Sequence, residues 1–227
     1  MDAPPPHGYS HGRMIPEQVA TLAGPGVRLE ARVAVPAGAS GGVVICHPHP
    51  LHGGDMDNHV VAVVAAACQA ANLATLRFNF RGVGGSSGTH DEGRGEQADA
   101  AAALDHLAAR LSTGAPLALA GYSFGAVVAT SVAADGRRLA GLALVAPPLA
   151  FPGREPMRPP AALRGPLLVV AGSADAYCPG DALERLAKDV PGAAVRVIEG
   201  ADHFFSDALE PLREALSGWA RQVAACR

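Results

Sequence analysis

Short apolar runs and longer amphipathic stretches alternate along the chain. The apolar runs predict strands that are covered on both faces. The amphipathic stretches predict helices, because an apolar residue every three or four positions forms one helical face. The expected strands are residues 27–35, 43–46, 75–80, 116–120, 142–146, 167–171 and 195–198. The expected helices are residues 57–71, 93–113, 126–134, 181–190 and 209–223. This alternation predicts an α/β fold with a mostly parallel sheet and helices on both faces.

Two of these elements carry finer predictions. Between residues 27 and 35 the apolar positions alternate with Arg28, Glu30 and Arg32, which is typical of a half-exposed strand, so we expect this strand at the edge of the sheet. Asp181 stands just before the fourth helical stretch and suits its N-cap, since a carboxylate can accept from the first free N–H groups of a helix.

The length and the N-terminal composition indicate one domain. The 227 residues suit a single α/β unit better than two. Residues 1–20 contain a run of three prolines and no regular pattern, so we expect a loosely ordered arm there and a single domain over residues 21–227. The arm lacks the apolar stretch of a signal peptide, which favours a cytoplasmic location.

Charge and cysteine content exclude several classes of partner. The formal net charge is −3 and no basic cluster occurs, which argues against nucleic acid. No apolar run reaches the length that spans a membrane. We expect the four cysteines to be free thiols, because none forms a C-x-x-C pair. They are Cys46, Cys68, Cys178 and Cys226. The sequence leaves the oligomeric state open, and a homodimer is among the states that it allows.

One pentapeptide carries candidate chemistry. Residues 121–125 read Gly-Tyr-Ser-Phe-Gly, the Gly-x-Ser-x-Gly pattern of a nucleophile elbow, between an expected strand and an expected helix. Such a turn holds Ser123 in a sparsely populated backbone conformation and exposes its hydroxyl. Gly121 and Gly125 are expected there because a side chain at either position would crowd the neighbouring strand or helix.

A serine nucleophile needs a base, and the base needs a carboxylate to orient it. In an open α/β sheet these groups gather at the carboxyl ends of strands. Asp175 follows the expected strand 167–171, and His203 follows the strand 195–198. The order Ser123, Asp175, His203 is the order that accompanies this elbow. Asp181, as a helix cap, and Asp202, beside the histidine, are less suitable acids.

Acyl transfer also needs donors for an oxyanion. The N–H of Phe124, directly after the serine, is the first candidate. The second should come from the loop after the strand 43–46, which reads His-Pro-His-Pro-Leu-His-Gly-Gly. Its two prolines have no N–H to donate. We therefore expect the N–H of His49, with that of Leu51 as the alternative.

The same loop suggests a competing hypothesis. His47, His49 and His52 resemble the zinc ligands of metallo-β-lactamase-like proteins, and Asp55, Asp57 and His59 lie close by as further candidate ligands. Leu51 stands where that motif has an aspartate. The two prolines favour a backbone turn instead. We expect neither a metal nor a cofactor.

Three segments together resemble one family. The loop at residues 47–58, the segment Arg-Phe-Asn-Phe-Arg-Gly-Val-Gly-Gly-Ser-Ser-Gly at residues 77–88 and the elbow are similar to the α/β-hydrolase superfamily. Within it, they resemble small lidless bacterial proteins with a His-Pro-His-Pro-Leu-x-Gly-Gly loop. The resemblance covers residues 25–225. It implies an eight-stranded sheet with the elbow strand at its centre, and Ser123, Asp175 and His203 as the triad. Many relatives have Asp where this chain has Asn79, and we interpret that segment as structural support.

These features predict a serine hydrolase, a carboxylesterase that acts on small or short-chain acyl esters. The short-chain expectation comes from residues 147–166, where dense prolines forbid a helical lid. Two alternatives stay open. The same triad could serve a thioesterase or an acyltransferase, and the fold could bind without catalysis.

Overall fold

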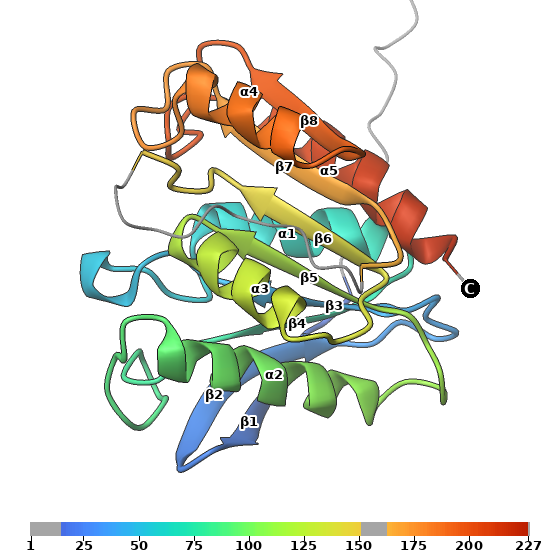
Figure 1. Ribbon diagram of the computed structural model, residues 1–227. Coiled ribbons are helices and arrows are strands. Elements are labelled where there is room, and N and C mark those ends of the chain that lie inside the picture. The colour runs from blue at the N-terminus through green and yellow to red at the C-terminus, as the bar shows by residue number, and fades with distance from the viewer. Residues whose placement is uncertain (1–14, 151–162, 227) are drawn as a thin grey trace, which may run out of the picture.

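Eight strands form one sheet in the computed structural model, which describes residues 15–150 and 163–226 (Figure 1). The strands are β1 (Gln18–Gly24), β2 (Val27–Ala34), β3 (Gly42–Cys46), β4 (Ala74–Phe78), β5 (Leu117–Tyr122), β6 (Gly141–Val145), β7 (Leu167–Gly172) and β8 (Ala193–Ile198). Their order across the sheet is β1-β2-β4-β3-β5-β6-β7-β8. The pairs β1–β2 and β2–β4 are antiparallel, and all others are parallel. The elbow strand β5 therefore lies inside the parallel part of the sheet, as predicted.

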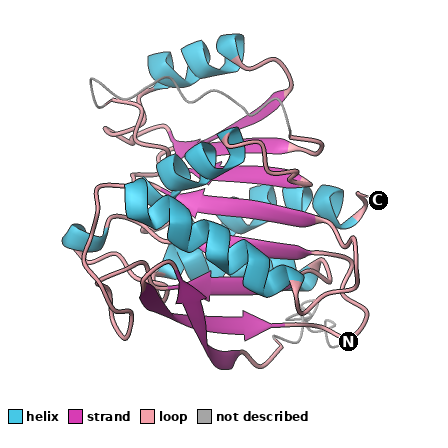
Figure 2. Ribbon diagram, turned by 60° about the horizontal axis from the view of Figure 1, so that its bottom comes forward, coloured by secondary structure: helices cyan, strands magenta, loops and turns pink. Residues whose placement is uncertain are grey.

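Helices cover both faces of this sheet (Figure 2). They are α1 (His59–Ala70), α2 (Arg94–Ala108), α3 (Phe124–Ala134), α4 (Gly180–Asp189) and α5 (Leu209–Ala224). The helices α2, α3 and α4 contribute to one buried cluster, and α1 and α5 contribute to the other. Asn58 caps α1 by accepting from the N–H of Val60 at 2.9 Å.

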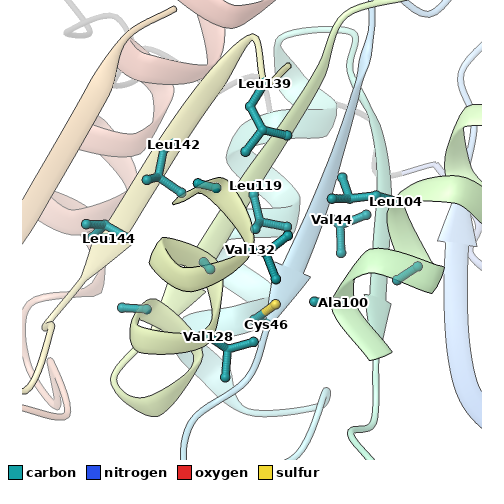
Figure 3. Close-up of a cluster of buried hydrophobic side chains, with 14 of the residues drawn as sticks. Val44, Cys46, Ala100, Leu104, Leu119, Val128, Val132, Leu139, Leu142 and Leu144 are labelled. Carbon is teal, nitrogen blue, oxygen red and sulfur yellow. The ribbon is translucent and has the colours of Figure 1, made fainter. Parts of the chain in front are cut away.

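Small aliphatic side chains build the core. Figure 3 shows one face, where Leu119 of β5 lies among Val44 of β3, Leu142 of β6 and Val132 of α3. The closely packed strands and helices fix the end of β5 from all sides, because protein interiors pack at nearly crystalline density. The core thus provides a rigid base for the turn that follows β5.

The prediction of an edge position for residues 27–35 is wrong. Strand β2 pairs with β1 on one side and β4 on the other, and β1 forms the edge. The alternation arises instead because only one face of β2 is covered by core: Leu29 is buried, whereas Arg28 is exposed on the opposite face. Since β1 begins at Gln18, ordered structure also starts within the expected arm, most of which lies outside the described residues.

Other boundaries differ as well. Helix α2 ends at Ala108 instead of residue 113. Asp181 does not cap α4, because Pro179 occupies the N-cap and Asp181 pairs with Arg185 at 2.7 Å. The proline-rich stretch 147–166 falls largely outside the described residues, and its described parts contain neither helix nor strand. All four cysteines are free, as predicted.

Candidate active site

The sharp turn after β5 has the predicted conformation. Ser123 has φ 53° and ψ −116°, a combination that non-glycine residues rarely adopt. Its N–H donates to the carbonyl oxygen of Val145 in β6 at 2.9 Å, which ties the turn to the neighbouring strand. A Cβ at Gly121 would lie 2.2 Å from the carbonyl oxygen of Gly125, and a Cβ at Gly125 would lie 2.2 Å from that of Cys46. Only glycine fits at these two positions, as the sequence predicted.

Three predicted side chains meet above this turn. His203 Nε2 lies 3.0 Å from Ser123 Oγ, and His203 Nδ1 lies 2.8 Å from Asp175 Oδ2. A carboxylate only accepts, so Nδ1 carries the proton and Nε2 accepts from the serine hydroxyl. The second carboxylate oxygen of Asp175 accepts from the N–H groups of Tyr177 and Cys178 at 2.8 and 3.2 Å. The buried carboxylate is thus fully hydrogen-bonded and held in one orientation.

The two competing acids are committed elsewhere. Asp202 accepts from the N–H groups of Phe204 and Ser206 at 3.1 and 3.2 Å, and these bonds lower the pKa of its carboxyl group. Asp181 pairs with Arg185 on the exposed face of α4. Neither carboxylate orients His203.

Two further side chains, Tyr122 and His59, hold the segment around His203. Tyr122 donates from its hydroxyl to the carbonyl oxygen of His203 at 3.0 Å. His59, the first residue of α1, lies with Nε2 2.7 Å from the carbonyl oxygen of Phe204. The only available signal was that Tyr122 occupies a variable position of the elbow. Its partner is distant in the sequence and could not be inferred.

The candidate oxyanion donors lie where β3 and β5 end. Phe124 is the first residue of α3, and the N–H groups of a first helical turn have no partner within the helix. The N–H of Leu51 donates to His49 Nδ1 at 3.2 Å, which favours His49 over Leu51 as the second donor. The rings of His49 and Phe124 lie 4.8 Å apart, so the two backbone segments are neighbours.

The side chain of His47 connects this loop to the segment after β4. Its Nδ1 lies 2.7 Å from the carbonyl oxygen of Pro48, and its Nε2 accepts from the N–H of Phe80 at 3.0 Å. Burial lowers the pKa of the imidazole to about 4, so it is neutral at physiological pH. Both ring nitrogens are engaged, which makes His47 unsuitable as a metal ligand.

The other candidate ligands also have structural contacts. Asp55 accepts from the N–H of Asp57 at 2.8 Å. Asp57 in turn pairs with Arg77 at 2.6 Å. Within residues 15–150 and 163–226, no group of three or more His, Cys, Asp or Glu residues is arranged to hold a metal ion.

The segment after β4 supports the loop after β3. Asn79 accepts from the N–H of Met56 and donates to Glu30, both at 2.8 Å. Arg81 makes a two-pronged contact with the buried carboxylate of Asp99, at 3.0 and 2.7 Å. These contacts fix the backbone on which Phe80 meets His47. They fit the structural role that the sequence suggested for Asn79.

Comparisons with known proteins agree with this fold. Residues 42–225 match the family described as alpha/beta hydrolase domain. An alpha-beta serine hydrolase homologue from Coxiella burnetii is 38% identical, with a TM-score of 0.80 over 88% of this chain and 96% of that one. A serine hydrolase without a lid from Xanthomonas campestris is 33% identical, with a TM-score of 0.80 over 90% of this chain and 94% of that one.

A protein of Rickettsia prowazekii, itself uncharacterized, is 30% identical over 203 residues, which are 86% of this chain and 85% of that protein. The predicted fold and the resemblance to lidless bacterial hydrolases are confirmed. In the part of the chain that the structure describes, no helix could cross a membrane. The chain belongs to the alpha/beta hydrolase domain family.

Proposed function

We propose that this protein is a serine hydrolase of carboxylic esters, with Ser123 as nucleophile, His203 as general base and acid, and Asp175 as the group that orients the histidine. One observation carries the proposal. The hydroxyl of Ser123, on a strained turn, is linked to Asp175 through both ring nitrogens of His203, at 3.0 and 2.8 Å. This hydrogen-bonded chain is the arrangement that activates a serine.

The reaction proceeds in two halves. Ser123 Oγ attacks the acyl carbon while its proton passes to His203 Nε2. The bond between the acyl carbon and the alcohol oxygen then breaks, and His203 gives its proton to that oxygen, so the alcohol leaves. Water attacks the acyl-serine, again losing a proton to His203. The acid leaves as His203 returns the proton to Ser123.

The negative charge of each tetrahedral intermediate needs fixed donors. The N–H of Phe124, at the start of α3, and that of His49 are our candidates. Asp175 stabilises the imidazolium that forms at the same moment. Small or short-chain acyl groups fit best, because the relative from Xanthomonas campestris is a serine hydrolase without a lid.

A fluorophosphonate probe tests the proposal directly. The wild type should gain one adduct, which peptide mapping should place on Ser123. Ser123→Ala should lower kcat by about 10⁴- to 10⁶-fold on p-nitrophenyl esters. Ser131→Ala is the matched control, since its hydroxyl donates to the carbonyl oxygen of Val127 within α3. It should retain wild-type activity.

A parallel panel of acyl-CoA thioesters separates an esterase from a thioesterase with the same triad. Faster turnover of the thioesters than of the oxygen esters would favour a thioesterase. An acyltransferase would form product only when an alcohol or amine acceptor is added. Activity that survives in Ser123→Ala, or a probe adduct elsewhere, would overturn the proposal.

A further inference from the structure

Two exposed aromatic side chains lie beside His203. Tyr177 follows Asp175 after β7 and is 43% exposed, and Phe204 follows His203 and is 54% exposed. Their ring centroids lie 4.7 and 5.5 Å from that of His203. Among the described residues, the other aromatic side chains are buried. They are Phe78, Phe80, Tyr122, Phe124, Phe205 and Trp219. The chain thus exposes its described aromatic rings only around this histidine.

Hydrogen bonds fix the backbone that carries both rings. The N–H of Tyr177 donates to Asp175, and its carbonyl oxygen accepts from the N–H of Ala150 at 3.0 Å. The N–H of Phe204 donates to Asp202, and its carbonyl oxygen lies 2.7 Å from His59 Nε2. A ring whose backbone is already fixed loses little freedom when a ligand binds.

His203 itself does not require these rings for its orientation. Asp175 fixes its Nδ1, and Tyr122 fixes its carbonyl oxygen. Tyr177 and Phe204 remain 43% and 54% exposed beside this histidine, and a bound molecule can contact the exposed part of each side chain.

The chemistry of the site decides which part of a substrate reaches them. In the proposed reaction His203 Nε2 donates a proton to the alcohol oxygen, so that oxygen comes within hydrogen-bond distance of the ring. The first carbons of the alcohol must then lie alongside the imidazole. In the proposed reaction the acyl oxygen faces the candidate donors at Phe124 and His49. Tyr177 and Phe204 thus lie on the alcohol side.

We propose that Tyr177 and Phe204 bind the alcohol part of the substrate and that the enzyme prefers esters of flat, aromatic alcohols. This inference rests on the proposed function. Offset or edge-to-face contacts between aromatic rings add to simple apolar burial, and each such contact corresponds to about a two- to tenfold effect on kcat/KM.

Three acetate esters test the proposal with one constant acyl group. Benzyl, cyclohexylmethyl and butyl acetate have leaving groups that differ little in basicity, so differences in kcat/KM report on binding of the alcohol. The wild type should prefer benzyl acetate over both others. Tyr177→Ala and Phe204→Ala should each reduce that preference about two- to tenfold. Tyr177→Phe should retain it. Val19→Ala, which truncates a 77% exposed side chain on the edge strand β1, is the control and should change nothing.

Each outcome is decisive. An unchanged benzyl preference in both alanine variants would overturn the proposal, as would an equal loss on all three esters, which would assign the rings to His203 alone. Equal wild-type values for benzyl and cyclohexylmethyl acetate would also overturn the aromatic preference. Hydrolysis of none of these esters or of p-nitrophenyl acetate would overturn the proposed function, and this inference with it. Circular dichroism checks that each variant is folded.

Discussion

The hydroxyl of Tyr122 donates a hydrogen bond to the carbonyl oxygen of His203, 81 positions later in the chain. Tyr122 ends the elbow strand directly before Ser123, so one short segment carries the candidate nucleophile and also holds the backbone of its base. Burial raises the pKa of the phenol above its ordinary value, which keeps it a donor at neutral and moderately alkaline pH. The strained turn at Ser123 and the loop that carries His203 are therefore fixed relative to one another.

Tyr122→Phe should lower kcat while leaving KM nearly unchanged. The change keeps the ring but removes the donor, so His203 loses a restraint on its backbone and its Nε2 is aligned less well with Ser123. We expect a fall of about tenfold, the scale on which small misplacements of catalytic groups act. Steady-state kinetics on p-nitrophenyl acetate separates the two constants. An unaltered kcat would show that Tyr122 does not position His203.

Asp175→Asn should nearly abolish activity without unfolding the protein. The amide has the shape of the carboxylate but favours the wrong tautomer of His203 and cannot stabilise its charged form. The expected loss in kcat is about 10⁴-fold. Asp202→Asn is the matched control, because Asp202 only accepts from its own loop, and it should retain most activity. The reverse pattern would assign Asp202 as the orienting acid.

The sequence predicted those parts of the molecule that depend on neighbours along the chain. The elbow is such a part, because Gly121, Ser123 and Gly125 are close in sequence and the flanking strand and helix have clear patterns. The positions of Asp175 and His203 also followed, since parallel strands bring their carboxyl ends to one edge of the sheet.

Features that depend on distant contacts were missed. The edge position of β1 depends on its pairing with β2, and the alternation in β2 reports only which of its faces is covered. The contacts that Tyr122 and His59 make with the loop that carries His203 join segments far apart in the chain, and no local pattern encodes them. Asp181 was predicted as the N-cap of α4 because Asp is common at that position, but Pro179 occupies the N-cap.

Acid should destabilise the fold partly through His47. The unfolded imidazole binds a proton near pH 6.5, whereas the buried one does so only near pH 4, so the unfolded state binds more protons between these values. Stability then falls as the pH falls through this window, by about 2 kcal/mol between pH 7 and pH 5. Urea unfolding should show this loss in the wild type and a smaller one in His47→Gln, which cannot titrate. Equal losses in the two proteins would contradict the prediction.

Dialysis against a strong chelator should leave esterase activity unchanged. His47 engages both ring nitrogens within the protein, and Asp57 is paired with Arg77. The loop after β3 is thus built for hydrogen bonding within the protein. Activity that disappears on dialysis and returns with zinc would instead make the histidines ligands. Dialysis without chelator is the control.

His49→Pro and His49→Ala should separate the backbone of this residue from its side chain. Both variants lose the imidazole, and with it the acceptor for the N–H of Leu51, but only proline also removes the N–H of residue 49. The φ of −60° at His49 lies in the range that proline adopts. If this N–H stabilises the oxyanion, His49→Pro should have a kcat about 10²- to 10³-fold below that of His49→Ala. Thermal unfolding of the two variants establishes that both are folded. Equal values of kcat would contradict a role of the His49 N–H in stabilising the oxyanion.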